Sequence, residues 1–182
     1  MEFEAKLIEF LQAGASQGWT TFFKIVSLLG SWAGLLIVFL IFFMYNKRYS
    51  LGFLVTYGVG VGVNYLLKLI ISRPRPYMAY EGVQMLTNAL GNSFPSGHAV
   101  SSGIIALFVI AFVFMQSKNK FVRYGTILSM LMYVGIMCVA RMYLGVHYLT
   151  DVLAGVCVGT LIYCIYYIIR KKIIAASQRV EE

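Results

Sequence analysis

The 182-residue chain is strongly apolar: 60% of its residues are hydrophobic and only 12% are charged. A soluble domain carries about 25% charged residues, so this composition excludes an ordinary water-soluble fold and indicates lipid as the solvent. The formal net charge of +8 does not indicate nucleic-acid binding, because most basic residues lie in small groups at the ends of apolar stretches. We therefore expect no nucleic-acid partner.

The first twenty residues predict a short amphipathic helix at the membrane surface. Phe3, Leu7 and Phe10 recur at helical spacing, and charged residues occupy the other faces. A run of small and polar residues at 14–18 then interrupts the helix. Because no basic start and apolar core lead to a small-residue cleavage site, we do not expect a cleavable signal peptide.

The remainder of the chain predicts membrane-spanning helices. Its stretches without charge are each close to the roughly 20 residues that a helix needs to cross the hydrocarbon core. Only helices and closed barrels satisfy their backbone in lipid, and the period-2 alternation of barrel strands is absent. The sequence therefore predicts an all-α polytopic membrane bundle in one domain, with about five transmembrane helices. We expect an interfacial helix at 1–20, a transmembrane core at 21–170 and a cytoplasmic tail at 171–182. The expected spans lie near 25–45, 51–72, 96–116, 124–142 and 150–169.

Basic residues at the span ends predict the orientation. Three basic groups lie at alternate ends: Lys47-Arg48, then Lys118, Lys120 and Arg123, then Arg170-Lys171-Lys172. By the positive-inside rule these ends face the cytoplasm, so the opposite ends face outward.

Three short clusters hold every proline, both histidines and the only aspartate of the chain. They are Lys68-x6-Arg75-Pro76, Pro95-Ser96-Gly97-His98 and Arg141-x5-His147-x3-Asp151. All three fall at the predicted outer ends of spans. Polar groups are costly to place in a membrane protein, so their concentration here marks a functional site.

The second cluster lies at the start of a predicted span. Serine is a favoured N-cap, and the free N–H groups and dipole of a helix start suit a phosphate. Gly97 allows the backbone to approach a ligand closely, and His98 falls in the first turn. The alternative interpretation is a capped helix with a polar tip.

The third cluster predicts a reactive histidine. His147 and Asp151 are four residues apart, so on a helix they share one face. A carboxylate that accepts from one imidazole nitrogen leaves the other nitrogen free to react, so His147 is the expected nucleophile and Asp151 its orienting partner. A structural His–Asp pair is the alternative.

Lys68, Arg75 and Arg141 add positive charge to the same membrane face. Arginine offers a planar fork for phosphate oxygens and lysine a point charge, so the three predict a clamp for a phosphoryl group. Taken singly, Lys68 and Arg75 could each be a membrane-interface anchor.

A metal site is not expected. Zinc bound by His98, His147 and Asp151 would be opposed by three nearby cations, and neither a fourth ligand nor a second carboxylate presents itself. We therefore predict no metal and no cofactor.

The order and spacing of the clusters resemble the type-2 phosphatidic acid phosphatase family of membrane lipid phosphatases. That family's pattern is K-x6-R-P, then P-S-G-H, then S-R-x5-H-x3-D. The chain departs from it only at Ala140, where the family has serine. The resemblance runs from Lys68 to Asp151 and implies a metal-independent phosphatase of a bacterial cytoplasmic membrane. Undecaprenyl diphosphate, phosphatidylglycerol phosphate and phosphatidic acid are the implied substrates.

The resemblance also implies a role for each residue. His147 attacks phosphorus and forms a phosphohistidine, Asp151 orients it, and His98 protonates the leaving oxygen before water resolves the intermediate. The residues implied to hold the phosphate are Lys68, Arg75, Ser96, Gly97 and Arg141. The missing serine removes one hydroxyl contact to the phosphate or to Arg141. Arg73 and Tyr77 match no position of the pattern, and either could contact a headgroup or the interface.

Other interpretations remain open. A phosphotransferase would use the same site but pass the phosphoryl group to a hydroxyl other than that of water. A phosphate-lipid transporter is less expected, because no inverted repeat is visible and the polar clusters gather at one end instead of the bilayer midplane. A structural scaffold leaves the colocation of both histidines with the sole aspartate unexplained. The sequence leaves the lipid headgroup, the chain and the oligomeric state undetermined.

Overall fold

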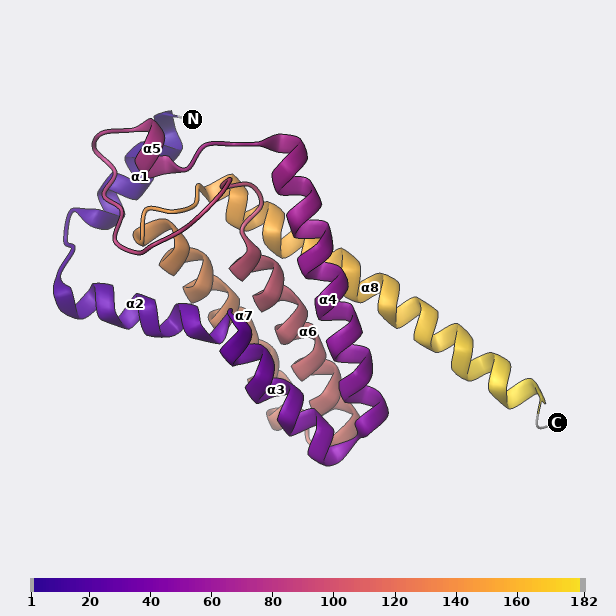
Figure 1. Ribbon diagram of the computed structural model, residues 1–182. Helices are drawn as coiled ribbons and strands as arrows, with labels where there is room; N and C mark the ends of the chain where they lie inside the picture. The colour runs from indigo at the N-terminus through magenta and orange to yellow at the C-terminus, as the bar shows by residue number, and fades with distance from the viewer. Residues whose placement is uncertain (1, 181–182) are drawn as a thin grey trace.

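The computed structural model describes residues 2–180, and every regular element in that range is a helix (Figure 1). The helices are α1 Glu2–Gln12, α2 Gln17–Leu29, α3 Trp32–Tyr45, α4 Lys47–Ile71, α5 Pro76–Ala79, α6 Gly97–Gln116, α7 Lys120–Tyr143 and α8 Leu149–Val180. The all-α prediction is confirmed. Residue 1 of the predicted interfacial helix and residues 181–182 of the predicted tail lie outside the described range.

Within residues 2–180, four stretches are long and apolar enough to cross a membrane: Lys47–Ala79, Gly97–Gln116, Lys120–Tyr143 and Leu149–Ala176. A fifth span arises if α2 and α3, which are bent by 46° at the break between them, are counted as one. The predicted number of about five is therefore confirmed.

The prediction of one continuous helix at 25–45 is wrong. α2 already begins at Gln17, and the helix is broken between Leu29 and Trp32. Gly30 caps the end of α2, and the Ser31 hydroxyl accepts a hydrogen bond from the Ala33 N–H at the start of α3. One helix thus ends where the next begins, because adjacent residues satisfy the free backbone groups of both ends.

The amino-terminal helix α1 packs on the bundle at the end where α8 begins (Figure 1). Ala5 and Ile8 are buried against the protein, whereas Phe3 and Phe10 are 72% and 76% exposed. Since Phe3 and Phe10 are seven residues apart, they share one outward face of the helix. The placement of that face in the membrane interface stays a prediction.

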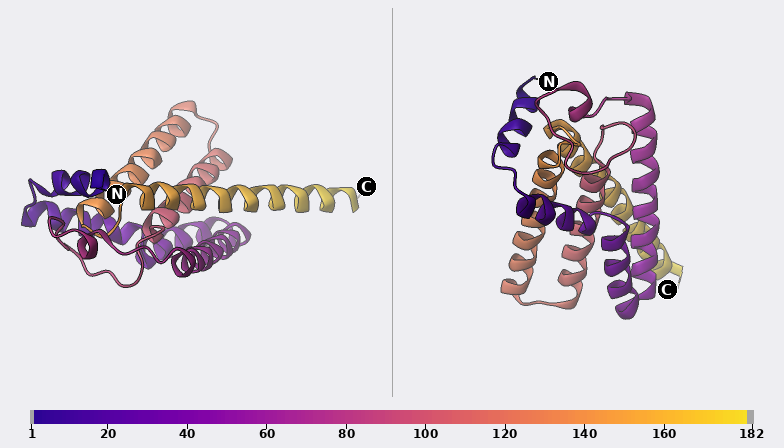
Figure 2. Two further views of the ribbon diagram at one scale, coloured as in Figure 1. Left: turned by 90° about the horizontal axis from the view of Figure 1, so that it is seen from above. Right: turned by 60° about the vertical axis from the view of Figure 1, so that its left-hand side comes forward.

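The core forms around α6, which packs against α4, α7 and α8 (Figure 2). Glycines make the contact with α8 close: a Cβ at Gly155 would lie 2.6 Å from the Ser96 carbonyl oxygen, and one at Gly159 would collide with the Val100 backbone. Two glycines four residues apart allow helix backbones to approach in this way. This seam fixes the start of α6 against the start of α8, where two of the polar clusters lie.

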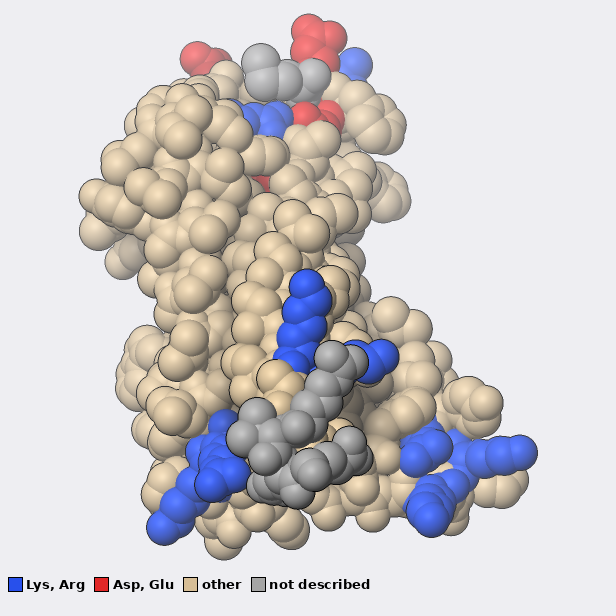
Figure 3. All heavy atoms as spheres, turned by 90° about the vertical axis from the view of Figure 1, so that its right-hand side faces the viewer, with Lys and Arg blue, Asp and Glu red and all other residues tan. Residues whose placement is uncertain are grey.

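The described acidic residues lie at one end of the molecule. In Figure 3, most of the visible Lys and Arg side chains lie in the lower half, whereas the Asp and Glu side chains lie at the upper end, beside a few Lys and Arg side chains. α8 continues as a helix to Val180, beyond the predicted end of its span near 169, and its residues 171–176 are exposed. The predicted cytoplasmic tail is thus helical over its described part, and its location stays a prediction.

Candidate active site

The fold brings the three polar clusters together at one end of the bundle. Arg75 Nη1 donates to the Val146 carbonyl at 2.9 Å, which joins the first cluster to the third. The Ser96 backbone N–H donates to the Asp151 carbonyl at 3.0 Å, which joins the second cluster to the third. His98 lies within electrostatic range of four predicted site residues: Arg141, His147, Arg75 and Lys68. The predicted convergence is therefore present.

The third cluster is built by a turn and a helix start. Arg141 lies in the last turn of α7, and Gly145 makes the following turn with φ +75°, a conformation that favours glycine. His147 therefore precedes α8 and is not part of it, so the predicted shared helical face is wrong. The two side chains still meet: His147 Nδ1 lies 3.6 Å from Asp151 Oδ2.

Asp151 is fixed by its own helix start. Its side chain is fully buried, and Oδ2 accepts a hydrogen bond from the Tyr148 N–H at 2.9 Å. Tyr148 precedes the first residue of α8, so Asp151 occupies the third helical position and satisfies a free N–H as in a capping box. The carboxylate thereby keeps one face toward His147.

The environment of His147 keeps its imidazole neutral. Burial lowers the pKa of His147 to about 3, against the raising effect of Asp151, and the positive charges of Arg141 and Arg75 lower it further. A neutral imidazole has a free electron pair on one nitrogen, which nucleophilic attack requires.

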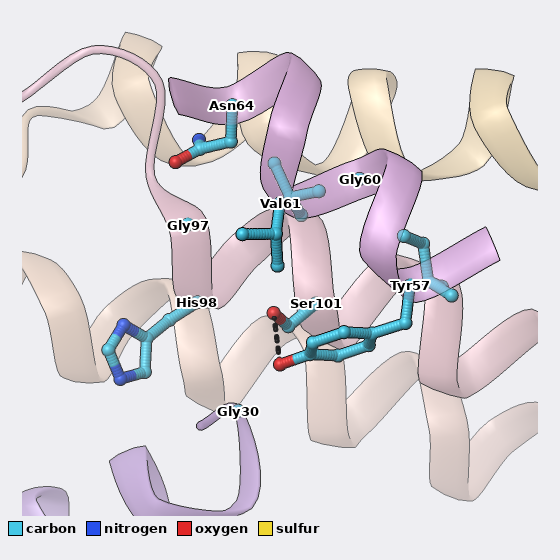
Figure 4. Close-up of a pocket in the computed structure, with 10 residues that line it drawn as sticks. Gly30, Tyr57, Gly60, Val61, Asn64, Gly97, His98 and Ser101 are labelled. Carbon is cyan, nitrogen blue, oxygen red and sulfur yellow. Dashed lines mark hydrogen bonds between the residues drawn. The ribbon is translucent and has the colours of Figure 1, made fainter. Parts of the chain in front are cut away.

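In the second cluster, Ser96 takes the predicted N-cap position of α6, but its side chain makes no capping hydrogen bond. Its hydroxyl is instead buried without a partner among residues 2–180. His98 follows in the first turn and lines a cavity of about 210 Å³ between α4, α6 and the break after α2 (Figure 4). The Ser101 hydroxyl and Tyr57 hydroxyl bond to each other at 3.0 Å on the cavity wall.

Three buried side-chain atoms make no hydrogen bond within the described residues: Ser96 Oγ, Arg141 Nε and His147 Nδ1. A buried polar group without a partner costs about 1–3 kcal/mol, and such groups call for an explanation. All three belong to predicted site residues. Because His147 Nδ1 faces Asp151 at 3.6 Å, Ser96 Oγ and Arg141 Nε are the two atoms that could bond a polar ligand.

In the first cluster, the side chains of Lys68 and Arg75 mostly donate hydrogen bonds to backbone carbonyl oxygens. Arg75 donates to three carbonyl oxygens, those of Gly91, Val146 and Leu90, which leaves two of the five guanidinium N–H groups. Lys68 Nζ donates to the Asn92 carbonyl at 2.6 Å. Both residues hold the 80–95 loop over the site, and their contact with phosphate stays a prediction.

Three residues of this region have no place in the sequence motifs. Arg73 Nη1 lies 2.7 Å from Asp151 Oδ1, and Arg73 Nη2 lies 2.9 Å from Glu4 Oε2. Ser27 Oγ accepts a hydrogen bond from Arg141 Nη1 at 3.1 Å. In the sequence, Arg73 is marked only by its place in the spacer between Lys68 and Arg75. Glu4 and Ser27 carry no signal, because their partners are distant in the chain.

Comparison with known proteins shows the family to which the chain belongs. The model of the PAP2 superfamily matches residues 49–175. Phosphatidylglycerophosphatase B of Bacillus subtilis is 35% identical over 126 residues, 66% of this chain and 58% of that protein. Undecaprenyl-diphosphatase BcrC of the same organism is 29% identical over 110 residues, 59% of this chain and 51% of that protein. The matched segment thus spans little more than half the length of these two relatives.

A solved structure shares the fold. It is the crystal structure of a transmembrane PAP2 type phosphatidylglycerolphosphate phosphatase from Bacillus subtilis. The TM-score is 0.78 at 24% sequence identity, over 94% of this chain and 86% of that one. The agreement covers the membrane bundle as a whole.

Proposed function

Because the chain belongs to the PAP2 superfamily, we propose that it removes phosphate from a membrane lipid phosphate or diphosphate, without a metal and through a phosphohistidine. The observation that carries the proposal is a buried His147 whose Nδ1 faces the Asp151 carboxylate at 3.6 Å. Around this pair the chain places Lys68, Arg75 and Arg141, whose charges suit a phosphoryl group.

The reaction proceeds by two displacements at phosphorus. Nε2 of His147 attacks, because Nδ1 faces Asp151, and the bond from phosphorus to the leaving oxygen breaks. Protonated His98 gives its proton to that oxygen. Water then attacks the phosphohistidine and gives its proton back to His98, the P–N bond breaks, and inorganic phosphate leaves.

The phosphate is held by donors from each cluster. Arg141 Nε and Ser96 Oγ are buried, have no hydrogen-bond partner within residues 2–180, and are free to bond phosphate oxygens. Gly97 begins α6, so its backbone N–H adds a donor at a helix N-terminus. Lys68 contributes a point charge, and Arg75 its two remaining N–H groups.

For the substrate we infer a lipid with a terminal phosphate or diphosphate, presented at the extracytoplasmic face of a bacterial cytoplasmic membrane. Phosphatidylglycerol phosphate and undecaprenyl diphosphate are supported by the names of two relatives, and phosphatidic acid has the same phosphomonoester chemistry. The separation of the basic span ends from the clusters supports the outward orientation.

The test is phosphate release by the purified protein in detergent with EDTA, from each of these three lipids. His147→Ala should abolish release, and Ser129→Ala, about 18 Å along α7 from Arg141, should retain it. The phosphohistidine should be found on the His147 peptide by mass spectrometry after an alkaline quench. Release by His147→Ala would overturn the nucleophile assignment. Transfer to an added alcohol without free phosphate would identify a phosphotransferase instead.

A further inference from the structure

Arg73 connects the catalytic carboxylate to the amino-terminal helix. It lies in the segment that follows α4, and Nη1 contacts both Asp151 Oδ1 and Thr150 Oγ1 at 2.7 Å. Nη2 contacts Glu4 Oε2 at 2.9 Å. The guanidinium carbon lies 3.9 Å from the centroid of the Tyr148 ring, which supports it from one face. Arg73 is thus held on three sides and supplies the counter-charge of a fully buried carboxylate.

Glu4 of α1 binds the same helix start. Its Oε1 accepts from the Thr150 N–H at 2.9 Å and from the Thr150 hydroxyl at 2.8 Å. The Glu4 carboxylate therefore satisfies a free N–H at the N-terminus of α8 in addition to binding Arg73. Burial alone would raise the pKa of Glu4, but the hydrogen bonds from Thr150 and Arg73 lower it below its usual value. Glu4 is therefore ionised at neutral pH.

Both oxygens of Asp151 are fixed by these contacts. Arg73 binds Oδ1, and the Tyr148 N–H binds Oδ2, the oxygen that faces His147. The position of the carboxylate relative to the imidazole thus depends on where Arg73 lies. Glu4 helps to set that position together with Thr150 and Tyr148, and it is the only carboxylate other than Asp151 that pairs with Arg73 among residues 2–180.

We propose that Glu4 and Arg73 are positioning residues that align Asp151 with His147, so that the amino-terminal helix is part of the catalytic alignment. This inference rests on the proposed phosphatase function. Neither residue touches the phosphoryl group; each acts through Asp151. Loss of either should slow the chemical step and leave the binding of phosphate by the cations nearly unchanged.

The test uses Glu4→Gln and Arg73→Lys in the full chain, with two controls. Glu2→Gln makes the same chemical change at an exposed position of the same helix. Gln12→Ala loosens α1 without touching Arg73, because Gln12 bonds the Gln84 and Tyr143 carbonyls. Melting temperature is measured for every variant, so that a loss of α1 packing is separated from a loss of alignment.

We expect kcat to fall about 10-fold in Glu4→Gln and about 10- to 100-fold in Arg73→Lys, within the range that misplacement of a reacting group costs. KM should stay within about 2-fold, as expected when an interaction that acts only in the transition state is lost. Glu2→Gln should match the wild type, and Gln12→Ala should lower the melting temperature more than kcat. Equal kcat losses in Glu4→Gln and Gln12→Ala at equal melting temperatures would overturn the inference.

Binding of inorganic vanadate and inorganic phosphate tests the inference without turnover. Vanadate accepts a bond from the histidine nitrogen, whereas phosphate requires only the cations and the hydrogen-bond donors of Ser96 and Gly97, so Glu4→Gln should weaken vanadate binding more than phosphate binding. An equal effect on both anions would overturn the inference. A wild type that releases no phosphate from any lipid would overturn the proposed function, and vanadate binding would then decide the inference alone.

Discussion

At the scale of single residues, burial and neighbouring charges set the protonation state of His147. The imidazole is 3% exposed and lies between a carboxylate and two arginines. Burial disfavours the imidazolium ion and the neighbouring cations add to that effect, so Asp151 orients the ring without protonating it. A lowered pKa means that the neutral form persists to more acidic pH, so protonation of His147 does not limit kcat/KM above pH 5. In the complex, where the negative charge of the bound phosphate favours the protonated form of His98, kcat should fall only on the alkaline side within pH 5–9, as the general acid loses its proton.

Nuclear magnetic resonance can measure this directly, because the chain has only two histidines. In protein labelled at histidine, His98→Asn leaves the signals of His147 alone. We expect a neutral imidazole down to about pH 4, in line with the pKa of about 3. Adding Arg141→Gln removes a positive charge, so the midpoint should move upward. A midpoint near 6.5 in His98→Asn would contradict the neutral buried histidine.

At the scale of elements, the break between α2 and α3 has a consequence for the site. It lets α2 run at 46° to α3 and brings Ser27, in the last turn of α2, to Arg141. The serine that the family pattern places before Arg141 is Ala140 here, and a hydroxyl from another helix contacts the same arginine. Ser27 also donates to the Phe23 carbonyl at 2.9 Å, which orients its lone pairs toward the guanidinium.

Ser27→Ala should therefore weaken phosphate binding. The change leaves a buried Arg141 N–H without its acceptor, at a cost of about 1–3 kcal/mol, and frees the guanidinium to move. We expect KM to rise about 3- to 10-fold with a smaller effect on kcat. Ser129→Ala is the matched control, because its hydroxyl donates to the Gly125 carbonyl in the same way on an exposed face. Equal kinetic constants for the two variants would show that Ser27 does not support Arg141.

At the scale of the whole molecule, the candidate site and the basic groups of the predicted cytoplasmic face lie at opposite ends of the bundle. The loop between α5 and α6 contacts Lys68 and Arg75 of the first cluster, and the three basic groups lie at the other ends of the spans. Under the proposed function, an anionic headgroup would meet Lys68, Arg75 and Arg141 at the end that the positive-inside rule predicts to lie outside the cell. This orientation suits a lipid that is dephosphorylated on the outer leaflet.

Labelling with a membrane-impermeant maleimide can measure the orientation. In a protein whose three native cysteines are replaced, Asn88→Cys and Lys118→Cys place one exposed thiol at each end of the bundle. We expect Asn88→Cys to react in intact cells and Lys118→Cys to react only after lysis. The reverse pattern would place the site in the cytoplasm.

The sequence by itself determined the fold class and predicted that the residues of the candidate site come together. Apolar stretches of span length predict helices because lipid offers the backbone no other partner, and this local rule needs no tertiary information. The spans at α4, α6 and α7 agree with the structure within a few residues. The clusters converge as predicted, because polar residues at the same end of neighbouring spans are costly to expose to lipid and therefore face one another inside the bundle.

Only the tertiary structure decided the contacts between segments distant in the chain. The partners of Asp151 include Arg73 and, through it, Glu4, and the partner of Arg141 is Ser27. No local pattern encodes such pairs, because a hydrogen bond depends on where two backbones pass each other. The same holds for His147, which lies before α8 and meets Asp151 through a helix-start geometry instead of a shared helical face.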